Sequence, residues 1–165
     1  MAFWNSRKML AVGETAPDFE LKDVKGALLS SKELLGKAPA LFALFKVSCP
    51  VCQYTFPFLE RVHRGVAAER LQVVGISQDD AGSTRSFNQE CGLSFPVLLD
   101  TTRPGYPVSN RFGISTVPCL FLVEKDGRVS WTSTGFSKAD LEDLGATLGC
   151  PVFQQDEDVP AWKAG

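Results

Sequence analysis

The chain lacks any hydrophobic run long enough to cross a membrane. One of its longest apolar stretches, residues 38–45 with Pro39 inside it, falls well short of the roughly 20 residues that a membrane helix needs. The start of the chain carries its charges after the aromatic side chains and has no apolar core, so it does not resemble a secretory signal. We therefore predict no membrane partner and a cytoplasmic protein, or a periplasmic one if a leader was removed.

Charge of one sign and histidine are also scarce. Seventeen basic and nineteen acidic residues give a net charge of -2, and no basic tract could follow a phosphate backbone, which argues against nucleic acid as a partner. The only histidine is His63. Five cysteines at uneven spacing differ from the disulfide framework of a small secreted scaffold, so we expect mostly free thiols. The cysteines are Cys49, Cys52, Cys91, Cys119 and Cys150.

The length allows one well-filled domain. A chain of 165 residues with 44% hydrophobic content is too short for two ordinary domains, and no repeat or low-complexity segment is visible. We predict a flexible start over residues 1–11, a single domain over 12–149 and a polar tail over 150–165. We expect the protein to be a monomer.

Apolar patterning predicts a parallel unit at the centre of an α/β fold. Residues 40–45 and 71–76 are continuous apolar runs, typical of strands buried on both faces. Between them, residues 50–64 show helical spacing, with Pro50 suited to the first helical position. Strand, helix and strand form a βαβ unit whose crossover should be right-handed.

Shorter elements complete the expected sheet. The turn signal Lys25-Gly26 predicts an N-terminal hairpin, and Asp126-Gly127 predicts an antiparallel hairpin at the sheet edge. We thus predict a mixed sheet with helices on both faces. The remaining expected elements are helices over 83–91, 108–112 and 137–148, and strands over 95–99, 119–123 and 129–134.

The motif Cys49-Pro50-Val51-Cys52 carries the most specific chemistry. It lies where a buried strand ends and a helix begins, so free backbone N–H groups and the helix dipole would stabilise a thiolate at Cys49. Cys52 lies one helical turn on, within reach of a mixed disulfide formed at Cys49. Lys46 is a candidate to add a favourable positive charge, although a solvated lysine at a strand end is the simpler interpretation.

The motif alone leaves other interpretations open. Half of a zinc site would look the same, but zinc needs four ligands, and the chain offers no second cysteine pair. An inert disulfide is a further alternative, although a loop so small gives little entropic stabilisation. No cofactor or bound metal is needed for thiol chemistry at this pair.

Three further features resemble the thioredoxin superfamily and, within it, the TlpA-like and redoxin (AhpC/TSA-like) branch. Residues 12–19 are similar to that branch's opening hairpin, and Pro57 matches the proline of the active-site helix. Thr116-Val117-Pro118 resembles the cis-proline segment that faces the two cysteines. The longer span from Cys52 to Pro118 implies an inserted helix and strand. The resemblance covers residues 12–149.

The resemblance implies a thiol-disulfide oxidoreductase of thioredoxin-like fold. Cys49 would attack a disulfide in a protein or small molecule, Cys52 would resolve it, and an upstream dithiol would resupply electrons. Pro50, Val51, Val117 and Pro118 would line the substrate groove. The chain departs from the family at Ser48, where thioredoxins carry tryptophan, and it lacks both family acids, at Ala43 and at Thr55. The base for Cys52 is therefore not identified.

Two other functions remain as alternatives. Peroxiredoxins share the scaffold, but the proline and threonine that precede their nucleophile correspond here to Phe42 and Lys46. A copper(I) carrier is the rival from another class, although related carriers space their cysteines differently and use a distant histidine. The sequence also leaves open the direction of electron flow and the roles of Cys91, Cys119 and Cys150.

Overall fold

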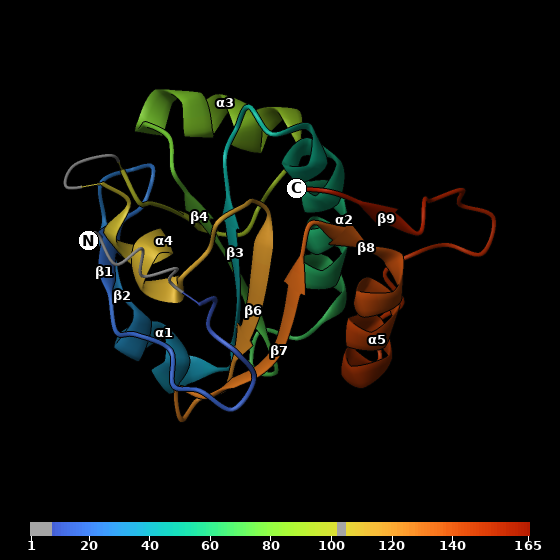
Figure 1. Cartoon of the computed structure of the whole chain (residues 1–165), viewed down its shortest axis with the longest axis horizontal. Coiled ribbons are helices and arrows are strands. Elements are labelled where there is room, and N and C mark those ends of the chain that lie inside the picture. Colours follow the sequence, from blue (N-terminus) through green and yellow to red (C-terminus); the bar gives the residue numbers. More distant parts are fainter. Residues whose placement is uncertain (1–7, 102–104) are drawn as a thin grey trace, which may run out of the picture.

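A five-stranded mixed sheet organises the protein, and its strand order is β5-β4-β3-β6-β7 (Figure 1). The structure is a computed structural model that describes residues 8–101 and 105–165. β3 pairs in parallel with β4, which pairs in parallel with β5, whereas β6 joins β3 and β7 in antiparallel register. The strands are β3 (Ala40–Phe45), β4 (Gln72–Ser77), β5 (Val97–Leu99), β6 (Cys119–Val123) and β7 (Val129–Thr134).

The central strand β3 is buried on both faces because all six of its residues are apolar. Successive side chains of a strand point to opposite faces, and β3 divides its residues between two hydrophobic clusters. Leu41, Ala43 and Phe45 belong to one cluster. Phe42 and Leu44 belong to the other. The sequence therefore places one continuous apolar strand between two cores.

Helices cover both faces of the sheet, as predicted (Figure 1). α2 (Pro50–Gly65), α3 (Ala81–Glu90) and α5 (Lys138–Leu148) add buried side chains to the first cluster. α1 (Ser31–Lys37) and α4 (Pro107–Phe112) add theirs to the second. The longest described helix, α2, has 16 residues, and no described helix combines the length and apolarity that crossing a membrane requires.

The N-terminal hairpin is confirmed, but the helix after it was not predicted. β1 (Glu20–Lys22) and β2 (Leu28–Ser30) pair antiparallel around the turn at Gly26, whose φ is +91°. α1 then begins because the Ser30 side chain accepts a hydrogen bond from the backbone N–H of Glu33 at 3.1 Å. Serine followed three residues later by glutamate is a helix-start signal that could have indicated this element.

The other expected elements are present with small changes at their ends. α3 begins before the predicted residue 83, because Asp80 caps it by accepting from the N–H of Ser83 at 2.8 Å. α5 starts where predicted, since Ser137 accepts from the N–H of Asp140 at 3.2 Å. Thus α3, β5 and α4 stand between the βαβ unit and β6, as the fold prediction required.

Residues 150–165 pack along the domain. Val152 and Val159 are buried, and Arg61 of α2 pairs with Glu157 at 2.6 Å. β8 (Phe136–Ser137) pairs with β9 (Trp162–Lys163), a pairing that was not predicted.

The predicted domain boundaries stay predictions. The predicted flexible start falls mostly on residues 1–7, outside the described residues, whereas the N–H of Leu10 bonds to the carbonyl of Phe112 at 3.0 Å.

Candidate active site

The two cysteines of the motif lie where β3 gives way to α2. Cys49 is the N-cap of α2, with extended backbone dihedrals, and Pro50 occupies the first turn, where its missing N–H costs no hydrogen bond. The helix continues through Pro57 to Gly65. Sequence therefore places Cys49 at the positive end of a 16-residue helix, as predicted.

The Cys49 sulfur has two polar contacts. Its Sγ accepts a hydrogen bond from the backbone N–H of Cys52 at 3.2 Å, and its thiol faces the carbonyl oxygen of Val117 at 3.5 Å. The residue is half-buried, so the sulfur can be approached from outside. The first contact satisfies a free N–H at the helix start and would strengthen when the sulfur carries negative charge.

Cys52 differs from Cys49 in having no exposed surface. Burial, followed by the hydrogen bond with Cys49, raises the pKa of the Cys52 thiol far above its ordinary value. The charges of Cys49 and Cys119 also raise this pKa, whereas a hydrogen bond with the backbone of Lys46 lowers it. At neutral pH the buried thiol therefore keeps its proton until a base comes close.

The loop before β6 faces Cys49. The Val117–Pro118 peptide bond is cis, as the resemblance implied. Val117 is half-buried and Pro118 is buried. Directly behind them, the buried Cys119 thiol faces the carbonyl of Thr116 at 3.1 Å. Burial raises the pKa of Cys119 to about 11, which suits a packed thiol.

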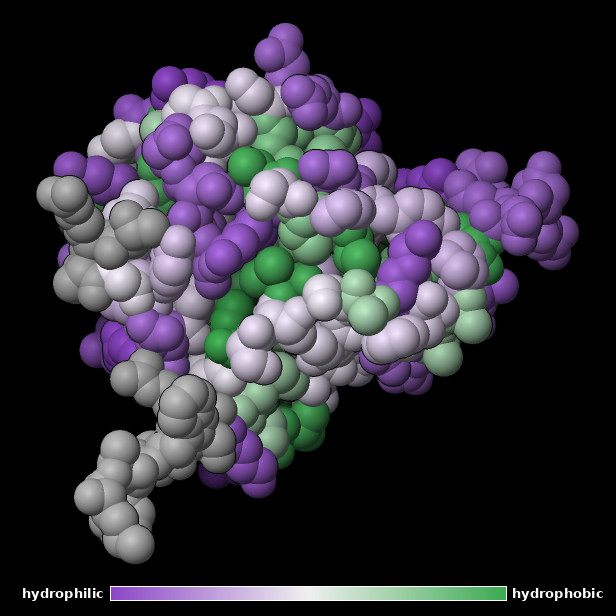
Figure 2. Space-filling model, turned by 45° about the horizontal axis from the view of Figure 1, so that its top comes forward, coloured by the Kyte–Doolittle hydropathy of each residue, from purple (hydrophilic) through white to green (hydrophobic). Residues whose placement is uncertain are grey.

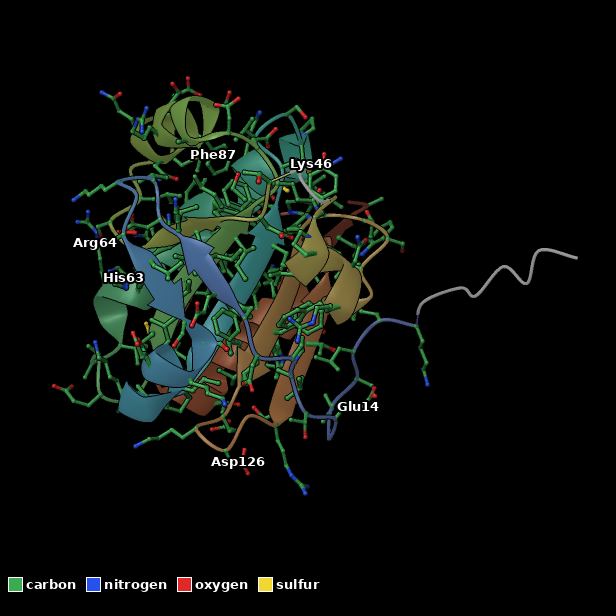
Figure 3. All side chains as sticks on the ribbon, turned by 90° about the vertical axis from the view of Figure 1, so that its left-hand side faces the viewer. Glu14, Lys46, His63, Arg64, Phe87 and Asp126 are labelled. Carbon is green, nitrogen blue, oxygen red and sulfur yellow. The ribbon has the colours of Figure 1, made fainter. Side chains whose placement is uncertain are left out.

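A cavity of about 500 Å³ opens beside the half-buried sulfur. The Lys46 Nζ lies 5.6 Å from the centre of the Tyr106 ring, a cation–π arrangement at this cavity. Figure 3 shows Lys46 at the end of the molecule opposite Asp126. Figure 2 turns this end forward and shows apolar surface in the middle of the face, between hydrophilic margins. The lining includes Lys46, Cys49, Pro50, Tyr106, Thr116 and Val117.

A buried polar network supports one wall of this cavity. Asp100, which has no exposed surface, accepts hydrogen bonds from the N–H groups of Val108 and Ser109 at 3.1 and 2.7 Å. The Ser109 hydroxyl donates to Asp100 at 2.7 Å and accepts from the Gln78 side chain at 2.9 Å. Asp100 thereby holds the start of α4, which carries Ser109 against the cavity. Sequence reasoning missed this network because no local spacing joins its members.

The predicted groove residues share this end of the molecule. Val117 and Pro50 line the cavity with Cys49, whereas Val51 is half-buried and packs against the first hydrophobic cluster. Thr55, at the position of the family's glutamate, is buried and donates to the Val51 carbonyl at 2.7 Å. The threonine thus serves helix packing, and it supplies no carboxylate to Cys52.

Glu60 is the buried carboxylate of α2, and its oxygens are already occupied. It accepts from the N–H of Ser94 at 2.9 Å, from the Ser94 hydroxyl and from Arg64 at 3.2 Å. Burial acts to raise the pKa of Glu60, but the hydrogen bonds from Ser94 and Arg64 lower it overall. It lies eight residues beyond Cys52, about 12 Å along the helix, too far for direct proton transfer.

The only histidine stands apart from the cysteine pair. His63 packs edge-on against Phe95 with 5.8 Å between ring centres, and it follows Cys52 by 11 residues, about 16 Å along α2. Figure 3 shows His63 well away from Lys46. Among residues 8–101 and 105–165, no three His, Cys, Asp or Glu side chains gather as metal ligands would. His63 therefore lies too far along α2 to join the two cysteines as a third copper ligand.

Comparison with known proteins agrees with this site. Residues 12–132 match the profile of the AhpC/TSA family. The thiol-disulfide oxidoreductase ResA of Geobacillus kaustophilus (strain HTA426) is 28% identical over 142 residues, which cover 85% of this chain and 79% of that protein. ResA of Bacillus subtilis (strain 168) is 26% identical over 135 residues, covering 81% and 73%.

Solved structures show the same fold. A putative thiol:disulfide interchange protein DsbE from Chlorobium tepidum superposes with a TM-score of 0.73 and 25% identity over 83% of this chain and 94% of that one. The peroxidoxin BcpB of Mycobacterium tuberculosis has a TM-score of 0.73 and 24% identity, over 85% and 97%, and shows the fold alone. The peroxidase alternative is thus less supported. The chain belongs to the AhpC/TSA family and is a thiol-disulfide oxidoreductase.

Proposed function

We propose that Cys49 is the attacking thiolate of this oxidoreductase and that Cys52 is its resolving thiol. The observation that carries the proposal is the contrast between them: the Cys49 sulfur is half-buried beside a cavity, whereas Cys52 has no exposed surface. Only Cys49 can meet a substrate directly. Cys52 can reach only a sulfur already bonded at Cys49.

The exchange then proceeds in two displacements. The Cys49 thiolate attacks one sulfur of a substrate disulfide, forms a mixed disulfide and releases the first substrate thiolate. Cys52 gives its proton to that departing thiolate, attacks the Cys49 sulfur and releases the second substrate thiolate. Two electrons pass to the substrate, and the pair ends as a Cys49–Cys52 disulfide. An upstream dithiol reduces it again.

Residues around the two thiols have supporting roles in this exchange. The Val117 carbonyl borders the attacking sulfur, and the cis bond to Pro118 orients that carbonyl. Pro50 and Val51 separate the two thiols at the start of α2. Lys46 places a positive charge at the cavity that favours an anionic sulfur. We further propose that the protein works as a monomeric reductase in a reducing compartment, the cytoplasm, where such a dithiol would be kept reduced.

Trapping tests the assignment of the two thiols. Cys52→Ser should accumulate a mixed disulfide with the substrate at Cys49, visible as an added mass, because resolution is lost while attack remains. Cys49→Ser should form no adduct and show no turnover. Cys91→Ser, a matched control at a half-buried cysteine elsewhere, should behave as the unmodified protein. Turnover that survives in Cys49→Ser would refute the proposal.

The reduction potential of the Cys49–Cys52 pair tests the proposed direction of electron flow. The protein is equilibrated in glutathione or dithiothreitol buffers, and its free thiols are trapped. A two-electron transition that is lost in Cys49→Ser and lies near the thioredoxin range, about -270 mV, supports a reductase. A transition near the oxidising end, about -120 mV, would overturn that direction.

A further inference from the structure

The segment Trp162–Gly165 lies against the loop that borders the attacking sulfur. Gly165 rests so closely on Thr116 and Val117 that an added Cβ would collide with the Val117 carbonyl and lie 3.0 Å from the Thr116 hydroxyl. That Val117 carbonyl is the one that faces the Cys49 thiol at 3.5 Å. The 162–165 segment therefore occupies one side of the approach to Cys49, and Figure 1 shows this end of the chain beside α2.

Specific contacts hold the 162–165 segment in place. Lys163 pairs with Phe136 and Trp162 with Ser137 in the β8–β9 ladder. The Lys163 ammonium lies 5.1 Å from the centre of the Tyr54 ring. Just before the segment, the Ala161 carbonyl accepts from the N–H of Lys138 at 3.0 Å. Such a segment has to be moved before another chain can lie along Thr116 and Val117.

The remaining approach is the cavity of about 500 Å³, which Gly165 also lines. A cavity of this size accommodates a small molecule. A disulfide within a folded protein brings extended backbone on both sides of its cysteine, and this backbone would meet the 162–165 segment. A small disulfide carries no such flanks and can enter through the cavity.

We propose that the 162–165 segment is a specificity element that admits small disulfides to Cys49 and disfavours disulfides held in folded proteins. The inference rests on the proposed function, since it takes Cys49 as the attacking sulfur. A protein substrate would react only with molecules in which the segment has moved away, so its rate is reduced by the fraction of such molecules. The rate of attack on a small disulfide would not be reduced in this way.

A pair of glycine substitutions isolates the segment. At Gly135 an added Cβ would lie 2.6 Å from the Lys163 carbonyl oxygen and 3.2 Å from the Gly165 nitrogen, so Gly135→Ala should push the segment outward. Gly149→Ala is the matched control, because Gly149 has nearly the same φ, +67° against +69°, and nothing lies within 4 Å of its added Cβ. Both variants strain the backbone alike, and only one displaces the segment.

The assay compares insulin with hydroxyethyl disulfide as substrates, and it normalises each rate to the reaction with free dithiothreitol. The unmodified protein should favour hydroxyethyl disulfide by at least about tenfold. Gly135→Ala should bring the two normalised rates within about threefold, while Gly149→Ala should keep the original ratio. Equal normalised rates in the unmodified protein would overturn the proposal.

A second variant keeps the test decisive if Gly135→Ala fails to fold. Lys163→Gly removes the contact with Tyr54 and should shift the ratio in the same direction. Hydrogen exchange at residues 162–165 verifies that the segment has loosened; an unchanged ratio despite faster exchange overturns the proposal. If Cys49→Ser loses both activities while the loosened segment variants keep the original ratio, only the specificity element is refuted. Activity that survives in Cys49→Ser refutes the proposed function itself.

Discussion

Asp100→Asn should destabilise the fold and loosen the cavity wall beside Cys49. The carboxylate accepts three hydrogen bonds, from the N–H groups of Val108 and Ser109 and from the Ser109 hydroxyl. An asparagine offers one oxygen, so its NH₂ group would face a backbone N–H in a site without exposed surface.

The magnitude follows from these contacts. A hydrogen bond to a charged acceptor contributes about 1.5–3 kcal/mol, and a buried N–H left without a partner costs about 1–3 kcal/mol. We expect a loss of about 3 kcal/mol in the free energy of unfolding. For a chain of this size, that corresponds to a fall in Tm of about 6–12 °C. Because α4 forms one wall of the cavity, KM for a small disulfide should rise more than kcat falls.

Chemical denaturation and thermal unfolding measure the stability, and steady-state kinetics measure KM. Asp80→Asn is the matched control, because Asp80 also caps a helix but is exposed, and asparagine caps as well as aspartate. A loss below about 1 kcal/mol for Asp100→Asn would refute the reasoning, since it would mean that the network contributes little.

Three further predictions concern other groups. First, burial raises the pKa of Cys52 above the ordinary thiol value of 9.0, so above that pH the unfolded chain loses a proton that the folded chain keeps. The reduced protein should therefore lose stability as pH rises above 9.0, by up to about 1.4 kcal/mol per pH unit for one thiol. Cys52→Ala should weaken this pH dependence in denaturant titrations, and an unchanged dependence would contradict the prediction. Second, Lys46→Gln should slow attack on a small disulfide about twofold to fivefold and reduce its salt dependence, as stopped-flow kinetics would show; an identical salt dependence would argue against a role for the charge. Third, Glu60→Gln should cost about 2 kcal/mol near neutral pH. Because the hydrogen bonds lower the pKa of Glu60 below 4.5, its stabilising contribution is present above pH 4.5 and is lost as pH falls below it. The free energies of unfolding of the variant and the unmodified protein should therefore converge in acid. A constant difference between them down to the lowest pH would contradict the assignment.

Much of the fold could be predicted because its signals are local. The apolar run Ala40–Phe45 and the pattern of Pro50–Gly65 fix a buried strand and an amphipathic helix, and the motif at their junction defines the two thiols. The hairpin around Asp126-Gly127 follows from turn chemistry alone. These features need no knowledge of distant contacts.

The missed parts depend on residues far apart in the sequence. Asp100 and Gln78 both form hydrogen bonds with the Ser109 hydroxyl only because the ends of β4 and β5 meet α4 in the fold. The pairing of Trp162 with Ser137 joins two strands of two residues each, too short to show a period. Such arrangements come from tertiary packing, which overrides local propensity. The base for Cys52 stayed open in the sequence because Ala43 and Thr55, at the positions of the family acids, carry no carboxylate.

Cys49, the proposed attacking thiolate, is also the N-cap of α2, and this double role links redox chemistry to folding. The N–H of Cys52 bonds to the Cys49 Sγ at 3.2 Å, and a thiolate accepts such a bond more strongly than a disulfide sulfur does. The free energy by which the reduced chain is harder to unfold than the oxidised chain must reappear as a higher reduction potential, about 30 mV for each 1.4 kcal/mol. Unfolding both forms in urea would therefore measure how far the native helix makes this dithiol a weaker reductant than the same pair in the unfolded chain.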